Sequence, residues 1–97
     1  MTTGDVLASY RRLAILQVLN QDSDFRMNDV LLATVLKTQG QGAPLAVVRG
    51  DLAWLEAQGL LATDDLPGCT VAILRRAGAD IAEGLAGYPG IAKLALD

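Results

Sequence analysis

The stretch Val47–Leu61, VVRGDLAWLEAQGLL, carries the clearest local pattern in this chain of 97 residues. Val48, Leu52 and Leu55 recur at helical spacing and predict one apolar stripe, which a helix buries against a core. Gly59 stands where a helix usually ends, because glycine adopts a left-handed backbone without steric cost. The residues that follow have the composition of a short strand. We therefore expect a helix that leads directly into a strand.

The face opposite this stripe consists of small residues. The positions concerned are Ala46, Gly50, Ala53 and Ala57, none of which has a side chain that forms hydrogen bonds. Proteins read base edges with donors and acceptors such as Arg, Lys, Asn and Gln, and here only Arg49, on one flank, offers such a group. Small residues instead let another helix approach closely. This face predicts a contact with a protein partner, tight packing within the monomer, or no role.

Two further helices are expected before this stretch. Asp5–Gln21 is the first, with Asp5 or a preceding threonine at its start. Its apolar residues fall on both sides, so it is either sandwiched centrally or carries a second face for a partner chain. A polar loop, Asn20–Arg26, follows. Asn28 is a good N-cap for the second helix, Asp29–Gln39, and Gly40 suits the residue after its end. The expected core stripe of the second helix is Leu31, Leu32, Val35 and Leu36.

A hairpin and a last helix are expected after the third helix, which begins near Pro44 because proline needs no amide donor there. Leu60–Asp65 and Cys69–Arg75 are short strand candidates. Pro67 and Gly68 between them suit the centre of a type II turn. Ala77–Leu85 is expected to be the last helix.

One domain is expected over residues 1–97, with a core at about 5–86 and a tail at 87–97. Ile91, Leu94 and Leu96 are expected to dock the tail on its own domain or on a partner. The composition is 52% apolar and 4% aromatic, so aliphatic side chains build the core. No apolar run is long enough to span a membrane and no signal-peptide layout is present, so a cytoplasmic location is expected.

The inventory of reactive side chains is small. The chain has one cysteine, Cys69, and no histidine, which leaves no internal disulfide, no ordinary zinc site and no imidazole for acid-base chemistry. Asp22 and Asp24 lack the other ligands of a calcium loop, and no nucleophile accompanies the paired acids Asp64 and Asp65. We therefore expect no metal, no cofactor and no enzymatic activity.

The charge balance bears on any affinity for nucleic acid. The net charge is −3, so binding to DNA requires a local basic patch. Asp64 and Asp65 near the hairpin turn would repel a phosphate backbone. The candidates for DNA contact are Lys37, Gln39, Gln41, Arg49, Arg75 and Arg76. Because a strong DNA binder often neutralises about 6 to 10 phosphates, weak or assisted binding to double-stranded DNA is expected.

The pattern Val-x3-Leu-x2-Leu-Glu-x2-Gly-Leu of residues 48–60 resembles the recognition helix and first wing strand of winged helix-turn-helix domains, especially the ArsR-like and MarR-like regulators. The resemblance implies a mainly helical α+β fold with a three-helix core, a β-hairpin wing and a C-terminal helix. It also implies a homodimer through the first helix. The dimer candidates are Leu7, Tyr10, Ala14 and Val18. The metal-ligand cysteines of ArsR-like proteins have no counterpart at the helix positions here.

The segment Arg49–Glu56, followed by Gly59 and Leu60, also resembles a small family of uncharacterised proteins encoded in Mu-like prophages, with similarity from about Val6 to Gly90. The leading hypothesis is a prophage-encoded, DNA-binding transcriptional regulator with Arg49 as its main recognition residue. The alternative is a winged helix repurposed for protein interaction, in phage assembly or as an adaptor, with little DNA affinity.

Overall fold

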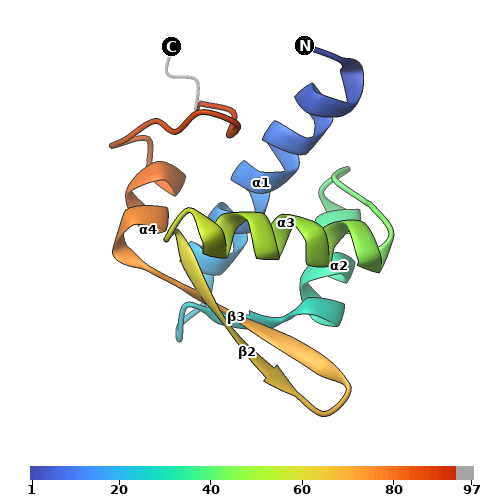
Figure 1. Cartoon of the computed structure of the whole chain (residues 1–97). Helices are drawn as coiled ribbons and strands as arrows, with labels where there is room; N and C mark the ends of the chain where they lie inside the picture. Colours follow the sequence, from blue (N-terminus) through green and yellow to red (C-terminus); the bar gives the residue numbers. More distant parts are fainter. Residues whose placement is uncertain (94–97) are drawn as a thin grey trace.

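A computed structural model describes residues 1–93 of the chain. Its elements are α1 (Thr3–Gln21), β1 (Arg26–Asn28), α2 (Asp29–Thr38), α3 (Leu45–Ala57), β2 (Leu61–Leu66), β3 (Cys69–Leu74) and α4 (Arg76–Ala82). These residues thus form four helices and a three-stranded antiparallel sheet (Figure 1). The α+β fold class predicted from the sequence is confirmed, and the layout is consistent with a winged helix. No helix formed by residues 1–93 combines the length and apolarity needed to cross a membrane.

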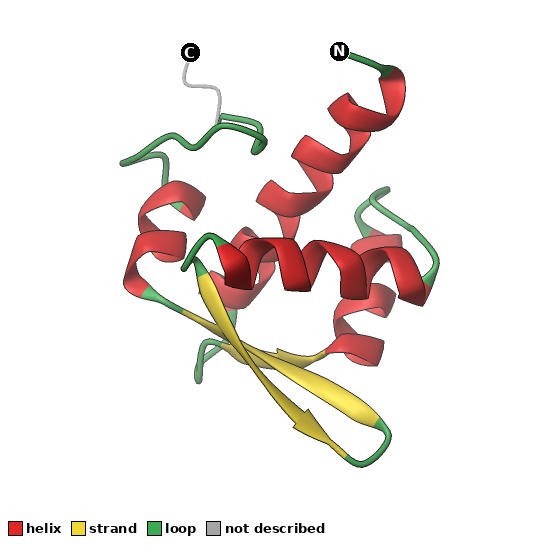
Figure 2. Ribbon diagram, viewed as in Figure 1, coloured by secondary structure: helices red, strands yellow, loops and turns green. Residues whose placement is uncertain are grey.

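The helices lie over one side of the sheet, and the β2–β3 hairpin extends away from them (Figure 2). α1 contacts α2, α3, α4 and β3, so it occupies the centre of the fold. α3 crosses the front of the molecule in Figure 1, next to the hairpin that forms the expected wing. Gly68 in the hairpin turn has φ +85°, the left-handed value that a type II turn requires at this position.

The sequence prediction missed β1, the first strand along the chain, because it assigned Arg26 to a loop. β1 pairs with β3 in the sheet order β1-β3-β2, with Arg26 opposite Ile73 and Asn28 opposite Val71. A strand of three residues is too short to reveal an alternating pattern. Pairing with β3, which is distant in sequence, therefore defines this strand.

The two halves of α1 have different surroundings. Most of its C-terminal half is buried by the other helices and the sheet, as the central-packing alternative predicts. The buried residues are Leu13, Ala14, Ile15, Leu16, Val18 and Leu19. Ala14 and Val18 are only 6% and 4% exposed, so the prediction that they face a second chain is wrong. The N-terminal half extends beyond the body of the domain, where Leu7 and Tyr10 are exposed (Figure 1).

The predicted helix ends are largely confirmed. Thr2 caps α1 and forms a capping box with Asp5. The Asn28 side chain accepts a hydrogen bond of 2.8 Å from the Leu31 amide and caps α2. Gly40 and Gly59, which follow α2 and α3, have φ values of +75° and +76°.

One predicted core residue of α2 is exposed. Leu31 was assigned to the apolar stripe, but 47% of its surface is accessible. The fully buried residues of α2 are Asp29, Leu32 and Leu36, at helical spacing, and Leu31 lies about 100° around the helix from Leu32. The sequence prediction was wrong because it did not anticipate that a carboxylate, Asp29, would occupy the buried position in the first turn.

The C-terminal tail packs on its own domain over the part that the structure describes. α4 ends at Ala82, earlier than the predicted Leu85, and Gly84 follows with φ +79°. Ile91 is buried, and the Ala92 amide donates a hydrogen bond of 3.0 Å to the Ser9 carbonyl of α1. The predicted tail contacts of Leu94 and Leu96 lie outside the described residues.

Candidate interaction surface

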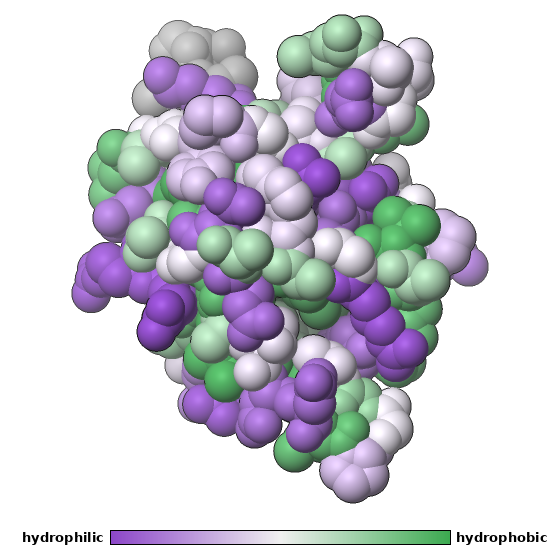
Figure 3. Space-filling model, in the orientation of Figure 1, coloured by the Kyte–Doolittle hydropathy of each residue, from purple (hydrophilic) through white to green (hydrophobic). Residues whose placement is uncertain are grey.

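The outward face of α3 is open to solvent. Val48, Leu52 and Leu55 are buried as predicted, with at most 1% of each exposed. The exposed positions are Ala46, Gly50, Ala53 and Ala57, as expected from the helical spacing. A Cβ added at Gly50 would meet no atom within 4 Å. Figure 3 shows largely pale atoms of intermediate hydropathy along this face.

Arg49, on the flank of this face, is bonded within the protein. Its Nε donates to Asp29 Oδ2 at 2.6 Å, and 48% of the Arg49 side chain is exposed, whereas that of Asp29 is fully buried. The Asp29 carboxylate therefore holds the residue that the sequence singled out for base recognition. A guanidinium that neutralises a buried carboxylate is less available to DNA, because releasing it would leave that charge unpaired.

The environment of Asp29 favours its charged form. Burial raises the pKa of Asp29, but the hydrogen bond and charge of Arg49, together with the backbone amides of Thr70 and Val30, lower it more, and the net pKa lies below the usual value. Asp29 Oδ1 nevertheless has no hydrogen-bond partner among residues 1–93. A buried oxygen without a partner costs about 1 to 3 kcal/mol of stability.

A groove of about 230 Å³ lies between α3 and the β2–β3 hairpin. Residues that line it are Arg49, Ala53 and Glu56 from α3 and Thr63, Asp65 and Thr70 from the hairpin. Glu56 accepts hydrogen bonds from the Thr63 amide and hydroxyl at 2.8 and 2.9 Å, and Asp65 accepts one from the Thr70 hydroxyl at 2.9 Å. Carboxylates therefore border the groove where a DNA-binding wing would carry basic side chains.

The opposite edge of α3 is joined to α1 through Asp51, which is 4% exposed. Arg11 Nε donates to Asp51 Oδ2, and Arg12 Nε lies 3.4 Å from Asp51 Oδ1. Both carboxylate oxygens are therefore paired with a guanidinium. The sequence analysis did not predict this contact, because its partners are about 40 residues apart in the chain.

An aromatic cluster next to Asp51 attaches the tail. Arg12 lies over the Trp54 ring at 4.1 Å and donates to the Gly90 carbonyl at 3.0 Å. Tyr88 meets the Trp54 ring edge to face, with centroids 6.1 Å apart, and its hydroxyl donates to Gln58 Oε1 at 2.6 Å. Trp54 itself is half-buried at the edge of the core cluster.

The remaining candidates for DNA contact do not form one patch. Lys37 and Gln39 are exposed and Gln41 is half-buried, and all three lie near the end of α2, before α3 begins. Arg75 and Arg76 are exposed beyond the other end of α3, where the Arg75 amide donates to the Leu60 carbonyl at 3.2 Å. The predicted set is therefore divided between the two ends of a helix about 20 Å long.

Groups that support catalysis or metal binding are sparse in the described chain. Residues 1–93 contain no cluster of three His, Cys, Asp or Glu side chains that could hold a metal ion. Cys69 is a free, half-buried thiol at the start of β3.

The protein is therefore a small α+β domain. Its exposed surface combines the open face of α3 with the β2–β3 hairpin, which carries carboxylates at the groove, and its tail docks on α1. The chain belongs to the same family as the uncharacterized protein gp26 of Escherichia phage Mu, to which it is 36% identical over 88 residues, or 91% of each chain. The sequence-based resemblance to a Mu-like phage family is thereby confirmed. No family profile and no solved structure matches the chain.

Proposed function

We propose that this protein is a winged-helix-like protein interaction module of a Mu-like phage, with little DNA affinity of its own. Its docking surface consists of the outward face of α3 and the adjoining groove. The observation that carries this proposal is the smooth, uncharged and exposed face through Ala46, Gly50, Ala53 and Ala57. Such a face allows a partner helix to approach closely.

The charges around this face support a protein partner over DNA. Arg49 is the positive residue of the surface formed by α3 and the wing, and its guanidinium is held by Asp29. The carboxylates on or beneath the same surface are Asp29, Glu56 and Asp65. A surface with this balance repels phosphates and does not release the counterions that drive DNA binding.

Capture experiments with two matched variants test this proposal. Immobilised protein is exposed to an extract of phage-producing cells, and bound proteins are identified by mass spectrometry. Gly50→Leu places a bulky side chain on the face and should reduce capture of a specific partner at least tenfold. Ala77→Leu, at an exposed position of α4, should leave capture unchanged. Equal capture by both variants and the parent protein would reject the α3 face as the docking surface.

The second candidate function is a DNA-binding transcriptional regulator. It is supported by the position of α3, which lies open beside a hairpin, the arrangement by which a winged helix inserts into the major groove. The half-exposed guanidinium of Arg49 and the exposed Lys37 are its DNA contacts.

A titration with a random-sequence DNA duplex at low salt separates the two functions. An interaction module should show no change in its amide NMR signals. A regulator should show binding that weakens steeply as salt increases, and Lys37→Gln should reduce it, whereas Arg49→Ala would also disturb the fold.

We further propose that the exposed N-terminal half of α1 mediates homodimer formation. Leu7 and Tyr10, at 57% and 52% exposure, supply the apolar contact. Sedimentation equilibrium should give a dimer mass, and Tyr10→Glu should convert it to a monomer. A monomer mass for the parent protein at about 100 μM would contradict this arrangement, and so would the same mass for the parent and the variant.

A further inference from the structure

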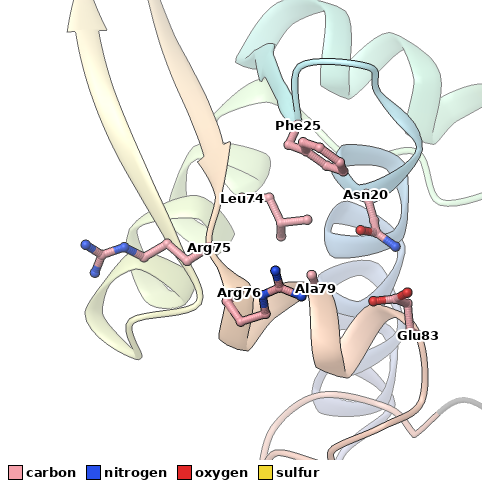
Figure 4. Close-up of a pocket in the computed structure, with 7 residues that line it drawn as sticks. All are labelled: Asn20, Phe25, Leu74, Arg75, Arg76, Ala79 and Glu83. Carbon is pink, nitrogen blue, oxygen red and sulfur yellow. The ribbon is translucent and has the colours of Figure 1, made fainter.

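A hollow of about 570 Å³ lies between the C-terminal end of α1, the loop after it and α4 (Figure 4). Residues that line it include Asn20, Phe25, Leu74, Arg76, Ala79 and Glu83. Its volume lies within the range of about 300 to 1,000 Å³ that is typical of ligand pockets. None of these residues belongs to the outward face of α3, so this hollow is a separate site.

The hollow has unpaired polar groups of opposite charge. The side chains of Arg76 and Glu83 lean toward each other across Ala79, and the Asn20 amide faces them from α1 (Figure 4). Within residues 1–93, neither charged group forms an ion pair. Seven residues along a helix span about 10 Å, so the two side chains rise from opposite ends of the hollow. Arg75 also borders the hollow, but its side chain turns away.

Phe25 covers the apolar part of this hollow in an unusual backbone conformation. Its φ is +57°, a left-handed value that glycine and asparagine adopt far more readily than a bulky aromatic residue. Hydrogen bonds fix this conformation, from the Phe25 amide to Asp22 O at 3.1 Å and from the Leu74 amide to Phe25 O at 2.8 Å. The ring remains 48% exposed, so core packing does not account for an aromatic residue at this strained position.

We propose that this hollow binds a short peptide segment of a partner protein in which an apolar or aromatic side chain lies between an acidic and a basic residue. The apolar side chain packs against Phe25 and Leu74. The acidic group binds Arg76 and the basic group binds Glu83. An extended chain rises about 3.3 Å per residue, so a span of up to about 10 Å corresponds to charges two or three residues apart.

Charge complementarity selects this occupant over a nucleic acid. A nucleotide would satisfy Arg76 and stack on Phe25, but its phosphates would be repelled by Glu83. A peptide with both charges neutralises both walls of the hollow. The peptide site does not depend on the α3 face, so it can be tested whether or not that face captures a partner.

The first experiment is an NMR titration of the whole protein with the peptide acetyl-Glu-Phe-Ala-Lys-amide. We expect saturable shifts confined to the amides around Asn20, Phe25, Arg76 and Glu83. Exposed ion pairs contribute modestly, so the uncharged peptide acetyl-Gln-Phe-Ala-Gln-amide should bind about fivefold more weakly. The peptide acetyl-Glu-Ala-Ala-Lys-amide should bind more weakly still. Equal binding of all three peptides, or equal binding of free phenylalanine, would overturn the proposal.

A charge-reversal pair tests the assigned contacts. Arg76→Glu and Glu83→Lys should each weaken binding of the parent peptide about fivefold. The double variant should prefer the reversed peptide, acetyl-Lys-Phe-Ala-Glu-amide. A double variant that still prefers the parent peptide would show that these side chains do not contact it.

Phe25→Asn separates binding from folding. Asparagine tolerates the left-handed backbone, so the melting temperature should be unchanged or higher while peptide affinity falls at least fivefold. Leu85→Asn, at an exposed apolar position outside the hollow, is the matched control and should not change affinity. If Phe25→Asn retained the affinity of the parent protein, the aromatic ring would not contribute to peptide binding, and this outcome would contradict the proposal.

Discussion

Asp29, beneath the edge of α3 that faces the β2–β3 hairpin, and Asp51, on the opposite edge, are both buried carboxylates, yet their partners differ. Asp51 has two arginine partners, Arg11 and Arg12, with side chains only 14% and 20% exposed, and both its oxygens are paired. Asp29 has one half-exposed arginine, and its Oδ1 has no hydrogen-bond partner in the described chain. The edge that joins α3 to α1 therefore pairs both oxygens of its carboxylate with guanidinium groups, whereas the edge next to the proposed docking groove pairs only one oxygen in this way.

Removing the Asp51 carboxylate should have the largest effect on stability. Asp51→Ala leaves two guanidinium groups without their partner and weakens the attachment of α1 to α3. We expect the free energy of unfolding to fall by about 3 to 5 kcal/mol, as when one partner of a buried ion pair is lost. Urea denaturation measures this change. A loss below about 1 kcal/mol would mean that solvent compensates these arginines and that the two edges do not differ.

Removing Arg49, the single arginine partner of Asp29, should cost less stability. Arg49→Ala leaves the buried Asp29 charge without its partner, but Arg49 is half-exposed and water can replace part of its contact. We expect a loss of about 2 kcal/mol in urea denaturation. The double variant Asp29→Asn, Arg49→Gln, which removes both charges, should be more stable than Arg49→Ala. If it is not, charge compensation is not the role of Arg49.

Lowering the pH should test how much the charged form of Asp29 contributes to stability. Its pKa lies below the usual value of 3.8, so the charged form contributes stability that is complete above pH 3.8 and is lost as the pH falls through the lowered pKa. The stability advantage of the parent protein over Asp29→Asn should therefore shrink when the pH is lowered from 5 to about 2. Melting temperatures across this range test it. A constant difference would contradict the assignment.

Substitution of Gly50, which lies between these two edges, should have the smallest effect on stability, and it should stabilise the protein. A Cβ there meets nothing within 4 Å, and alanine favours a helix over glycine by about 0.8 to 1 kcal/mol. Gly50→Ala should therefore raise the melting temperature by a few degrees in differential scanning calorimetry. A lower melting temperature would show that the outward face of α3 is less open than the contacts around Gly50 indicate.

Features determined by neighbouring residues in the chain could be predicted from the sequence. The stripe Val48, Leu52 and Leu55, the cap at Asn28 and the left-handed Gly59 depend on spacing and on intrinsic backbone preference. β1 could not be predicted in this way, because three residues carry no period and the strand exists only through its pairing with β3.

The candidate sites were predictable only in part. Helical spacing was sufficient to identify the exposed face of α3. Spacing gave no indication that Arg49 is held by a carboxylate 20 residues earlier in the chain. The same limit applies to the hollow, because α1, the loop and α4 bring its residues together from distant parts of the sequence. Phe25, an aromatic residue within an otherwise polar loop, is a local signal that the sequence analysis did not use.

The contacts of Arg12 with Gly90 and of Ser9 with Ala92 join segments about eighty residues apart. During synthesis on the ribosome, the first helix emerges long before the residues that fasten its N-terminal half. Such non-local closure is slow relative to helix formation, and a nascent chain that has not reached it exposes apolar surface. Synthesis of the residues around Gly90 and Ala92 therefore determines when the N-terminal half of α1 gains these contacts and is protected from proteases and from aggregation.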